Sequence, residues 1–305
     1  MKWIKKGLIY GPPGNSRWAQ RWALQPTPWL RDNGTIRIFC GFRTLDGVSR
    51  VGYVDVNADN PSEVLGVSPE PVLDIGIPGA FDENGVVPCV ISERDGKLYL
   101  YYAGYQLGHK VKFLAFGGLA ISEDGGESFV RYSRAPITDR TDDAVYFRAI
   151  HCLMNDDGVW RAWYGGGSHY TIKDDGQQLP NYNIRHAISD DGIHLRPDFT
   201  VCLDTRGEEY RVGRPHVIKR GGIYRMLFCA GTPTERYRLA YAESPDGINW
   251  TRKDDAMSVV GPKEYWDSEM QAYPCTVMYR DKVYLLYNGN NYGEDGFGYA
   301  VLEHW

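Results

Sequence analysis

A repeat of roughly sixty residues runs through this chain and constrains its fold more than any other feature. Five apolar strands end on a glycine, at Gly41, Gly104, Gly166, Gly231 and Gly289, so successive copies lie 58 to 65 residues apart. Such a period, made of short strands, is typical of β-propellers, in which blades pack around a central channel and leave few sheet edges exposed. The repeat predicts an all-β, five-bladed β-propeller with four-stranded antiparallel blades.

The five copies account for nearly all of the 305 residues, so we expect a single domain over 1–305. The expected blades cover residues 22–56, 81–129, 146–195, 210–250 and 266–302. Residues 3–10 alternate like a strand and are expected to close the ring against the last blade.

Three copies of the repeat also carry the turn string Ser-x-Asp-Gly, which begins at Ser122, Ser189 and Ser244. The first of these matches the Asp-box pattern. In such turns Ser and Asp side chains bond nearby backbone amides, and Gly supplies a positive φ. We therefore expect a structural role for these turns, with contact to calcium or substrate as the alternative.

Composition and charge exclude several classes of partner. The net charge is −5, which gives no general attraction for nucleic acid or anionic lipid, and no apolar run approaches the length of a membrane span. The N-terminal MKWIKKGLIY lacks the apolar stretch of a secretory signal, and the six cysteines show no CxxC spacing. We expect a cytoplasmic protein with reduced thiols, no cofactor, and no nucleic-acid or membrane partner.

Carboxylates precede the first strands of the second and fifth expected blades. These are Asp82, Glu83, Asp267 and Glu269. Glycosidic bond cleavage needs one carboxylic acid to protonate the leaving oxygen and, in most families, a second carboxylate as nucleophile or base. Asp82 and Glu269 are therefore the candidate catalytic acids, with Glu83 and Asp267 as substrate-binding residues. The alternative is that each carboxylate only caps a turn.

Basic and polar side chains follow on the same strands or close to them. Arg43, Arg148, His151, Arg214 and His216 are candidates for holding an anionic group, because guanidinium forks pair with carboxylate or phosphate. Gln271 and Tyr273 lie at the start of the first strand of the fifth expected blade, and they complete the predicted set of substrate-binding residues. The alternative is that these bases neutralise the acids in buried pairs.

A column of thiols and one imidazole also lines up across the repeat, at Cys89, Cys152, His216 and Cys275. These ligand types suit zinc when they face one another, but single free cysteines usually act as small buried side chains. No metal site is expected.

Over about Gln20 to Leu302 the sequence resembles the five-bladed propeller glycoside hydrolases and phosphorylases, such as invertases, arabinanases and mannoside phosphorylases. The resemblance is carried by the strings FDENGVVP, GRPHVIKRGGIYRM, YAESPDGINW, WDSEMQAYP and YNGNNYGEDGFGYA. It is nearest to a branch associated with surface-polysaccharide biosynthesis. The chain departs from the hydrolases in two places: residues 22–26 carry no acid, and the expected third blade offers Arg148 and His151 in place of a glutamate.

The resemblance and the residues together predict a carbohydrate-active enzyme. It would cleave or transfer a glycosidic bond of an anionic or phosphate-bearing sugar at the central channel. The alternative is an inactive propeller that binds a glycan or sugar nucleotide within a biosynthetic assembly, which the missing acid of the first blade favours. A protein-interaction platform is a third, less well supported interpretation.

Overall fold

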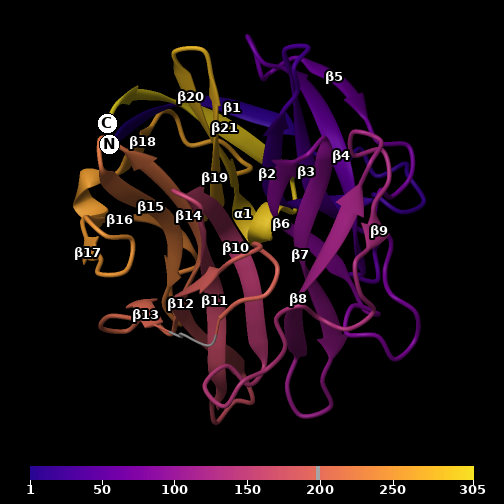
Figure 1. The fold of residues 1–305 in the computed structure, drawn as a ribbon, viewed down its shortest axis with the longest axis vertical. Coiled ribbons are helices and arrows are strands. Elements are labelled where there is room, and N and C mark those ends of the chain that lie inside the picture. Colours follow the sequence, from indigo (N-terminus) through magenta and orange to yellow (C-terminus); the bar gives the residue numbers. More distant parts are fainter. Residues whose placement is uncertain (197–199) are drawn as a thin grey trace.

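The computed structural model describes residues 1–196 and 200–305, and almost all of its ordered elements are β-strands (Figure 1). Helical structure within these residues is limited to a 3-10 turn at Asp254–Ala256 and the single-turn α1 (Asn290–Gly293). No helix among them is long and apolar enough to cross a bilayer. The all-β prediction is confirmed.

The strands follow one another in five antiparallel runs. The first run is β2 (Arg21–Leu30), β3 (Thr35–Arg43), β4 (Ser49–Asn57) and β5 (Val64–Val67); the second is β6 (Val86–Arg94), β7 (Lys97–Leu107), β8 (Phe113–Ser122) and β9 (Val130–Arg131). The third is β10 (Phe147–Asp156), β11 (Val159–Ile172), β12 (Gln178–Ser189) and β13 (Thr200–Leu203); the fourth is β14 (Arg211–Arg220), β15 (Ile223–Gly231), β16 (Arg238–Ser244) and β17 (Thr251–Arg252). The fifth is β19 (Ala272–Tyr279), β20 (Lys282–Asn288), β21 (Phe297–His304) and β1 (Lys2–Tyr10), with β18 (Ser258–Val260) parallel beside β1. Every repeat glycine lies in, or directly after, the second strand of its run.

Hydrogen bonding groups these runs into three sheets. The first and fifth runs are separate sheets, whereas short parallel pairs, β8 with β10 and β12 with β14, join the other three into one. The first strands β2, β6, β10, β14 and β19 nevertheless contact one another in that order, and β19 contacts β2. Five separate four-stranded blades therefore stay a prediction, while the meeting of the five first strands is observed.

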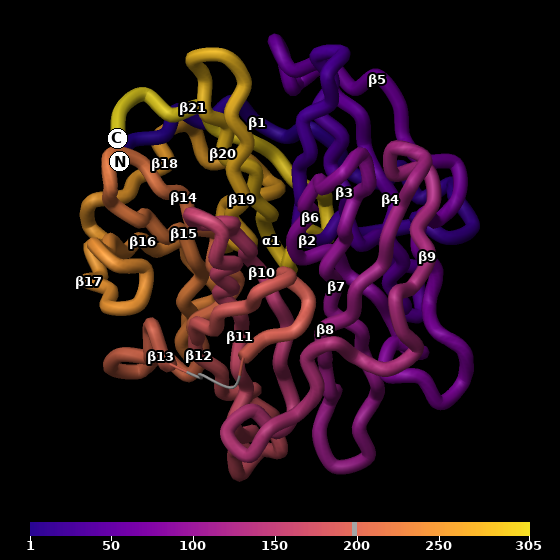
Figure 2. Tube along the Cα trace, in the orientation of Figure 1, coloured from indigo at the N-terminus to yellow at the C-terminus, as the bar shows by residue number. Residues whose placement is uncertain are grey.

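The two ends of the chain share one sheet. β1 pairs antiparallel with β21, from Lys2 opposite His304 to Tyr10 opposite Phe297, and Figure 2 shows the termini side by side. Trp3 is fully buried. The broader prediction, that this segment closes a single-domain ring, stays a prediction.

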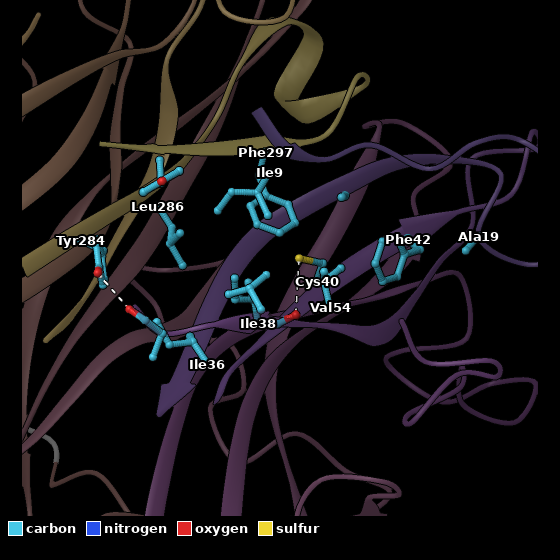
Figure 3. Close-up of a cluster of buried hydrophobic side chains, with 14 of the residues drawn as sticks. Ile9, Ala19, Ile36, Ile38, Cys40, Phe42, Val54, Tyr284, Leu286 and Phe297 are labelled. Carbon is cyan, nitrogen blue, oxygen red and sulfur yellow. Dashed lines mark hydrogen bonds between the residues drawn. The ribbon is translucent and has the colours of Figure 1, made fainter. Parts of the chain in front are cut away.

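Apolar packing fills the spaces between neighbouring runs. Every residue of β3 except Arg43 is buried, because one face of the strand packs on the second run and the other face packs on the fifth run. Figure 3 shows the second contact, where Ile38 and Phe42 of β3 face Leu286 and Phe297 of the fifth run. Strands covered on both faces read as continuous apolar stretches, which is the pattern that the repeat displays.

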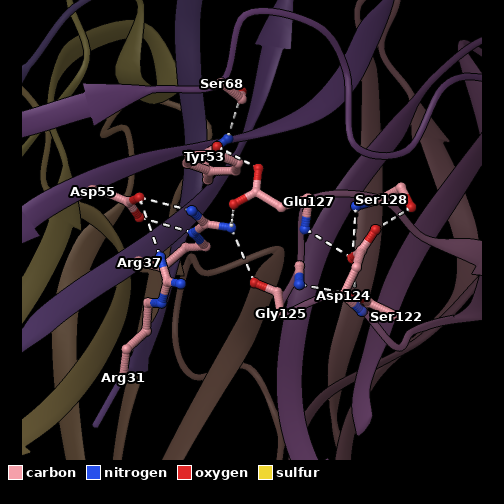
Figure 4. Close-up of polar contacts among 11 residues, drawn as sticks. Arg31, Arg37, Tyr53, Asp55, Ser68, Ser122, Asp124, Gly125, Glu127 and Ser128 are labelled. Atoms are coloured by element: carbon pink, nitrogen blue, oxygen red, sulfur yellow. Dashed lines mark hydrogen bonds and ion pairs between the residues drawn. The ribbon is translucent and has the colours of Figure 1, made fainter. Parts of the chain in front are cut away.

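The three Ser-x-Asp-Gly turns share one hydrogen-bond pattern. In the first, Ser122 Oγ accepts the amide of Gly126, and Asp124 Oδ1 accepts the amides of Glu127 and Ser128 (Figure 4). Ser189 with Asp191 and Ser244 with Asp246 repeat these contacts. The side chains replace backbone partners within the turn, which supports the structural role.

These turns predict a specific loss of stability in acid. Hydrogen bonds from Asn249 and from backbone amides lower the pKa of Asp246. A carboxylate whose pKa is lower in the folded than in the unfolded chain stabilises the fold at pH values above its unfolded pKa, which is about 4. This contribution is lost as the pH falls toward about 2. We expect Asp246→Asn to unfold more easily than the wild type at neutral pH, and the difference to shrink as pH falls through this range. Thermal unfolding at stepped pH tests this, and a constant difference would contradict it.

Candidate functional site

The first strands of all five runs break register at equivalent places. The breaks fall at Gln25 and Pro26 of β2, Cys89 of β6, His151 of β10, Arg214 and Pro215 of β14, and Tyr273 and Pro274 of β19. A bulge bends a strand and re-aims its side chains, and bulges are frequent next to active sites. Because the five strands also contact one another, the bulges meet in one region.

Backbone strain gathers in the same region. Nine described residues other than glycine have a positive φ, and three of them, Asp95, Asp157 and Arg280, occupy hairpin turns where this is common. The other six are Trp22, Gln25, Arg214, Tyr273, Asn291 and Tyr292. Each such residue costs on the order of 1–3 kcal/mol, and strain of this kind persists mainly where binding or catalysis needs it. The junction of the first strands is therefore the candidate site.

Arg214 is the hub of this junction. Its side chain is buried, and Nη1 donates to the carbonyls of Cys89 and His151 while Nη2 donates to Thr27 Oγ1, 3.1 Å away. One guanidinium thus ties β14 to β6, β10 and β2. Burial, reinforced by the positive charge of Arg214, lowers the pKa of His216 to about 3 and that of His151 well below its usual value. Both imidazoles are consequently neutral at pH 7.

Two further arginines lie beside this hub. The Arg211 guanidinium is buried among tyrosines, 3.9 Å from the Tyr237 ring centre, and donates to Tyr292 Oη at 3.0 Å. The Arg43 guanidinium lies 5.5 Å from the Trp22 ring centre. The Nε atoms of Arg43, Arg211 and Arg214 are buried without a hydrogen-bond partner among the described residues, and no described carboxylate forms an ion pair with these three side chains.

Phenol groups complete the site. Burial raises the pKa of Tyr105 to about 12, although Arg43 and Arg214 act in the opposite direction. Burial likewise raises the pKa of Tyr182 and Tyr273. At neutral pH these side chains are hydroxyl donors. We call the set of Trp22, Arg43, Tyr105, Tyr182, Arg211, Arg214, Tyr273 and Tyr292 the axial site; its charged members are all cations.

Asp82, a predicted catalytic acid, forms its described hydrogen bonds with residues outside the axial site. It is 1% exposed, and its Oδ2 accepts Tyr102 Oη at 3.0 Å and Arg131 Nε at 2.8 Å. Glu83 accepts the amide of Gly79 and, at 3.3 Å, Gln106 Nε2. Neither carboxylate contacts the axial site through a described hydrogen bond.

The acids of the fifth run repeat this arrangement on another sheet. Asp267 accepts Tyr287 Oη at 2.9 Å and pairs with Lys5 Nζ at 2.6 Å, so a buried carboxylate again lies between a tyrosine and a cation. Gln271 Nε2 reaches Asp267 at 3.4 Å, and Glu269 is exposed, with its amide donating to Asn290. Asp82 and Glu269 share no partner, so the structure does not join them as an acid pair, and their catalytic roles stay predictions.

The predicted basic residues divide between two regions. Four of them come together at the junction with Tyr273, namely Arg43, His151, Arg214 and His216. The fifth, Arg148, lies apart, and its Nη1 donates to the Asp139 carbonyl in the loop before β10. The alternative that the bases neutralise the acids in buried pairs holds for neither Arg43 nor Arg214 within the described residues, and Arg211 likewise has no described carboxylate partner.

The thiol column does not gather around one point. Cys275 Sγ lies 3.5 Å from His216 Nδ1, but Cys152 Sγ accepts the amide of Val217, and His216 Nε2 accepts that of Thr276 at 3.1 Å. Within residues 1–196 and 200–305 no three His, Cys, Asp or Glu side chains are placed to hold a metal ion. Burial raises the pKa of Cys275 to about 11, so it is a thiol at neutral pH.

Sequence reasoning overlooked most of the aromatic part of the axial site. Tyr105 directly follows the repeat glycine Gly104, and Arg43 follows Gly41 by two residues, so the positions just after the repeat glycine carried a usable signal. Tyr292 lies in α1, whose role no periodicity indicates. Trp22 begins the stretch 22–26, which the sequence distinguishes only by its lack of an acid.

Fold and site together define an all-β protein of glycoside-hydrolase-like architecture with a basic, tyrosine-lined axial site. A solved glycoside hydrolase superposes with a TM-score of 0.74 at 17% identity, covering 99% of this chain and 92% of that one. An alpha-L-arabinofuranosidase from Lactobacillus brevis gives 0.69 at 13% identity over 94% and 91%, and an enzyme from Xanthomonas citri complexed with xylotriose gives 0.61 at 15% over 95% and 89%. These likenesses establish the fold.

Relatives by sequence place the chain in a family. Uncharacterized protein Rv1502 of Mycobacterium tuberculosis is 34% identical over 307 residues, covering 99% of this chain and 100% of the relative, and protein MT1551 of another strain matches equally. The chain belongs to the family of Rv1502. No family model matches the sequence.

Proposed function

We propose that this protein binds an anionic carbohydrate, a sugar acid or a sugar phosphate, at the axial site. One observation carries the proposal: Arg43, Arg211 and Arg214 converge there without a described carboxylate partner, and their Nε atoms are buried and unpaired. A buried cation without a counter-charge is costly, and guanidinium is the side chain best suited to carboxylate and phosphate. An anionic ligand would supply the missing partner.

The aromatic groups favour a sugar as the carrier of that anion. Trp22, Tyr273 and Tyr292 surround the arginines, and the Tyr273 and Tyr292 rings are stacked with centres 6.2 Å apart. Aromatic rings offer apolar faces together with polar edges, which suits the C–H faces and hydroxyls of a pyranose. Structural neighbours were solved with xylose or xylotriose bound, which supports a carbohydrate ligand. A nucleotide sugar also meets these requirements.

A second candidate function is cleavage or transfer of a glycosidic bond, which the fold shared with glycoside hydrolases favours. In this case phosphate or the anionic sugar would occupy the arginines, and Asp82 or Glu269 would be the acid. The Oδ1 atom of Asp82 is buried and has no hydrogen-bond partner among the described residues, so one oxygen of this carboxyl group is not used by the fold.

Asp82→Asn and Glu269→Gln separate the two functions. We expect both variants to bind glucose 1-phosphate within about threefold of the wild type, and Asp82→Asn to lose on the order of 2 kcal/mol of stability because its bond to Arg131 is weakened. Isothermal titration, thermal unfolding and product analysis with a panel of glycosides and sugar phosphates give the readouts. Turnover by the wild type that either amide variant abolishes while remaining folded would establish the second function.

We also propose the wider setting in which this site works. The mutual contacts of β2, β6, β10, β14 and β19 support one five-bladed propeller over 1–305, with the axial site at the mouth of its channel. The six free cysteines support a reducing, cytoplasmic location. Binding of an anionic sugar suits a role in surface-polysaccharide metabolism.

A further inference from the structure

A cavity lies next to Trp22 of the axial site. It lies between residues 11–21 and residues 294–295 and has a volume of about 480 Å³, within the range of small-molecule sites. Its lining includes Leu8, Pro12, Gln20, Arg21, Tyr265 and Glu294. None of these residues belongs to the axial site or to the predicted catalytic pair.

The cavity wall is held in place by close backbone contacts. A Cβ atom on Gly11 would lie 2.3 Å from the Asp295 carbonyl, and one on Gly296, where φ is +113°, would lie 1.9 Å from the Tyr10 carbonyl. Only glycine permits this approach of the end of β1 to the segment before β21. The cavity is therefore a built feature of the fold.

The chemistry of the cavity differs from that of the axial site. Arg21 is paired with Glu294, whose Oε2 also accepts Asn291 Nδ2 at 2.7 Å, and Asp295 adds a negative charge. The formal charges of the Arg21, Glu294 and Asp295 side chains sum to −1, so the cavity does not favour an anionic ligand. Gln20 Oε1 accepts the amide of Leu45 at 3.0 Å, and its Nε2 donors bond to no described residue.

Apolar and aromatic groups face these polar ones. Leu8 and Pro12 line the cavity, and Tyr265 at its rim is 72% exposed. An exposed ring beside planar amide and carboxylate groups matches an uncharged pyranose, which has C–H faces and adjacent hydroxyls.

Trp22 connects the two sites. The Arg21 guanidinium lies 5.3 Å and the Arg43 guanidinium 5.5 Å from its ring centre, and the Trp22 amide donates to the Glu294 carbonyl. We propose that the cavity is a subsite for an uncharged sugar, so that the ligand is an oligosaccharide with a neutral unit here and its anionic unit on the arginines. The pairing of the units rests on the proposed function, whereas binding of the neutral unit does not.

Saturation-transfer NMR with the methyl glycosides of glucose, galactose and mannose tests the subsite in the full chain. We expect transfer to at least one glycoside, reduced at least about fivefold by Tyr265→Ala, because one stacked ring is removed. Tyr132→Ala removes another exposed tyrosine, 47% exposed and outside both sites, and is the matched control.

Two results would overturn the inference: no transfer to any of the three glycosides with folded wild type, or equal transfer in wild type and Tyr265→Ala. If the protein failed to bind glucose 1-phosphate, the proposed function would be wrong, but saturation transfer to the neutral glycosides would be unaffected. The two experiments therefore test the axial site and the subsite separately.

Discussion

Arg211→Ala should weaken the binding of glucose 1-phosphate on the order of 100-fold, because truncating one partner of a buried charge pair typically costs 2–5 kcal/mol. The guanidinium is held between tyrosine rings, so its position is fixed before the ligand arrives. Arg43→Ala should cost less, since this side chain is only half-buried. Isothermal titration at low and moderate salt gives both values.

The conservative variant separates binding from folding. Arg211→Lys keeps the charge but loses the planar fork, and we expect an intermediate affinity. Arg134 is exposed and lies outside the site, so Arg134→Ala should bind like the wild type. Unchanged affinity in folded Arg211→Ala would remove Arg211 from the binding site.

Arg214→Ala should lower the free energy of unfolding by about 4 kcal/mol, because three bonds from a buried guanidinium are lost and a void remains among β2, β6, β10 and β14. The carbonyls of Cys89 and His151 would then be buried with fewer donors. In a chain of this size each kcal/mol shifts the melting temperature by roughly 2–4 °C. Calorimetry should therefore show a drop of about 10 °C.

Arg214→Lys provides the comparison, because a single ammonium cannot reach three strands with the same geometry. We expect it to lie between the wild type and the alanine variant. A melting temperature for Arg214→Ala within about 2 °C of the wild type would show that this residue does not tie the first strands together.

The order of strands was predictable because the signal is local. An apolar stretch ending on glycine marks the second strand of every run, and the Ser-x-Asp-Gly strings mark turns whose side chains bond their own backbone. Sheet grouping was not predictable in the same way. The parallel pairs that join β8 to β10 and β12 to β14 involve only two and one residue pairs, and no composition signal accompanies them.

The candidate site was only partly predictable, for a physical reason. Asp82 and Asp267 occupy suggestive positions ahead of first strands, yet each is buried against a tyrosine of the second strand of its run and a cation from elsewhere in the chain, Arg131 or Lys5. Long-range partners of this kind leave no local pattern. The bulges at Arg214 and Tyr273 do have a local sequence pattern, since a proline follows each of these residues.

The central claim is that Arg43 and Arg211 hold the anionic group of a sugar at the junction of the first strands. A crystal structure of the wild type with glucose 1-phosphate tests it most directly. The account predicts the phosphate within hydrogen-bond distance of both guanidinium groups and the pyranose against Trp22, Tyr273 or Tyr292. A phosphate bound elsewhere on the chain, with the axial arginines contacting only protein and water, would contradict it.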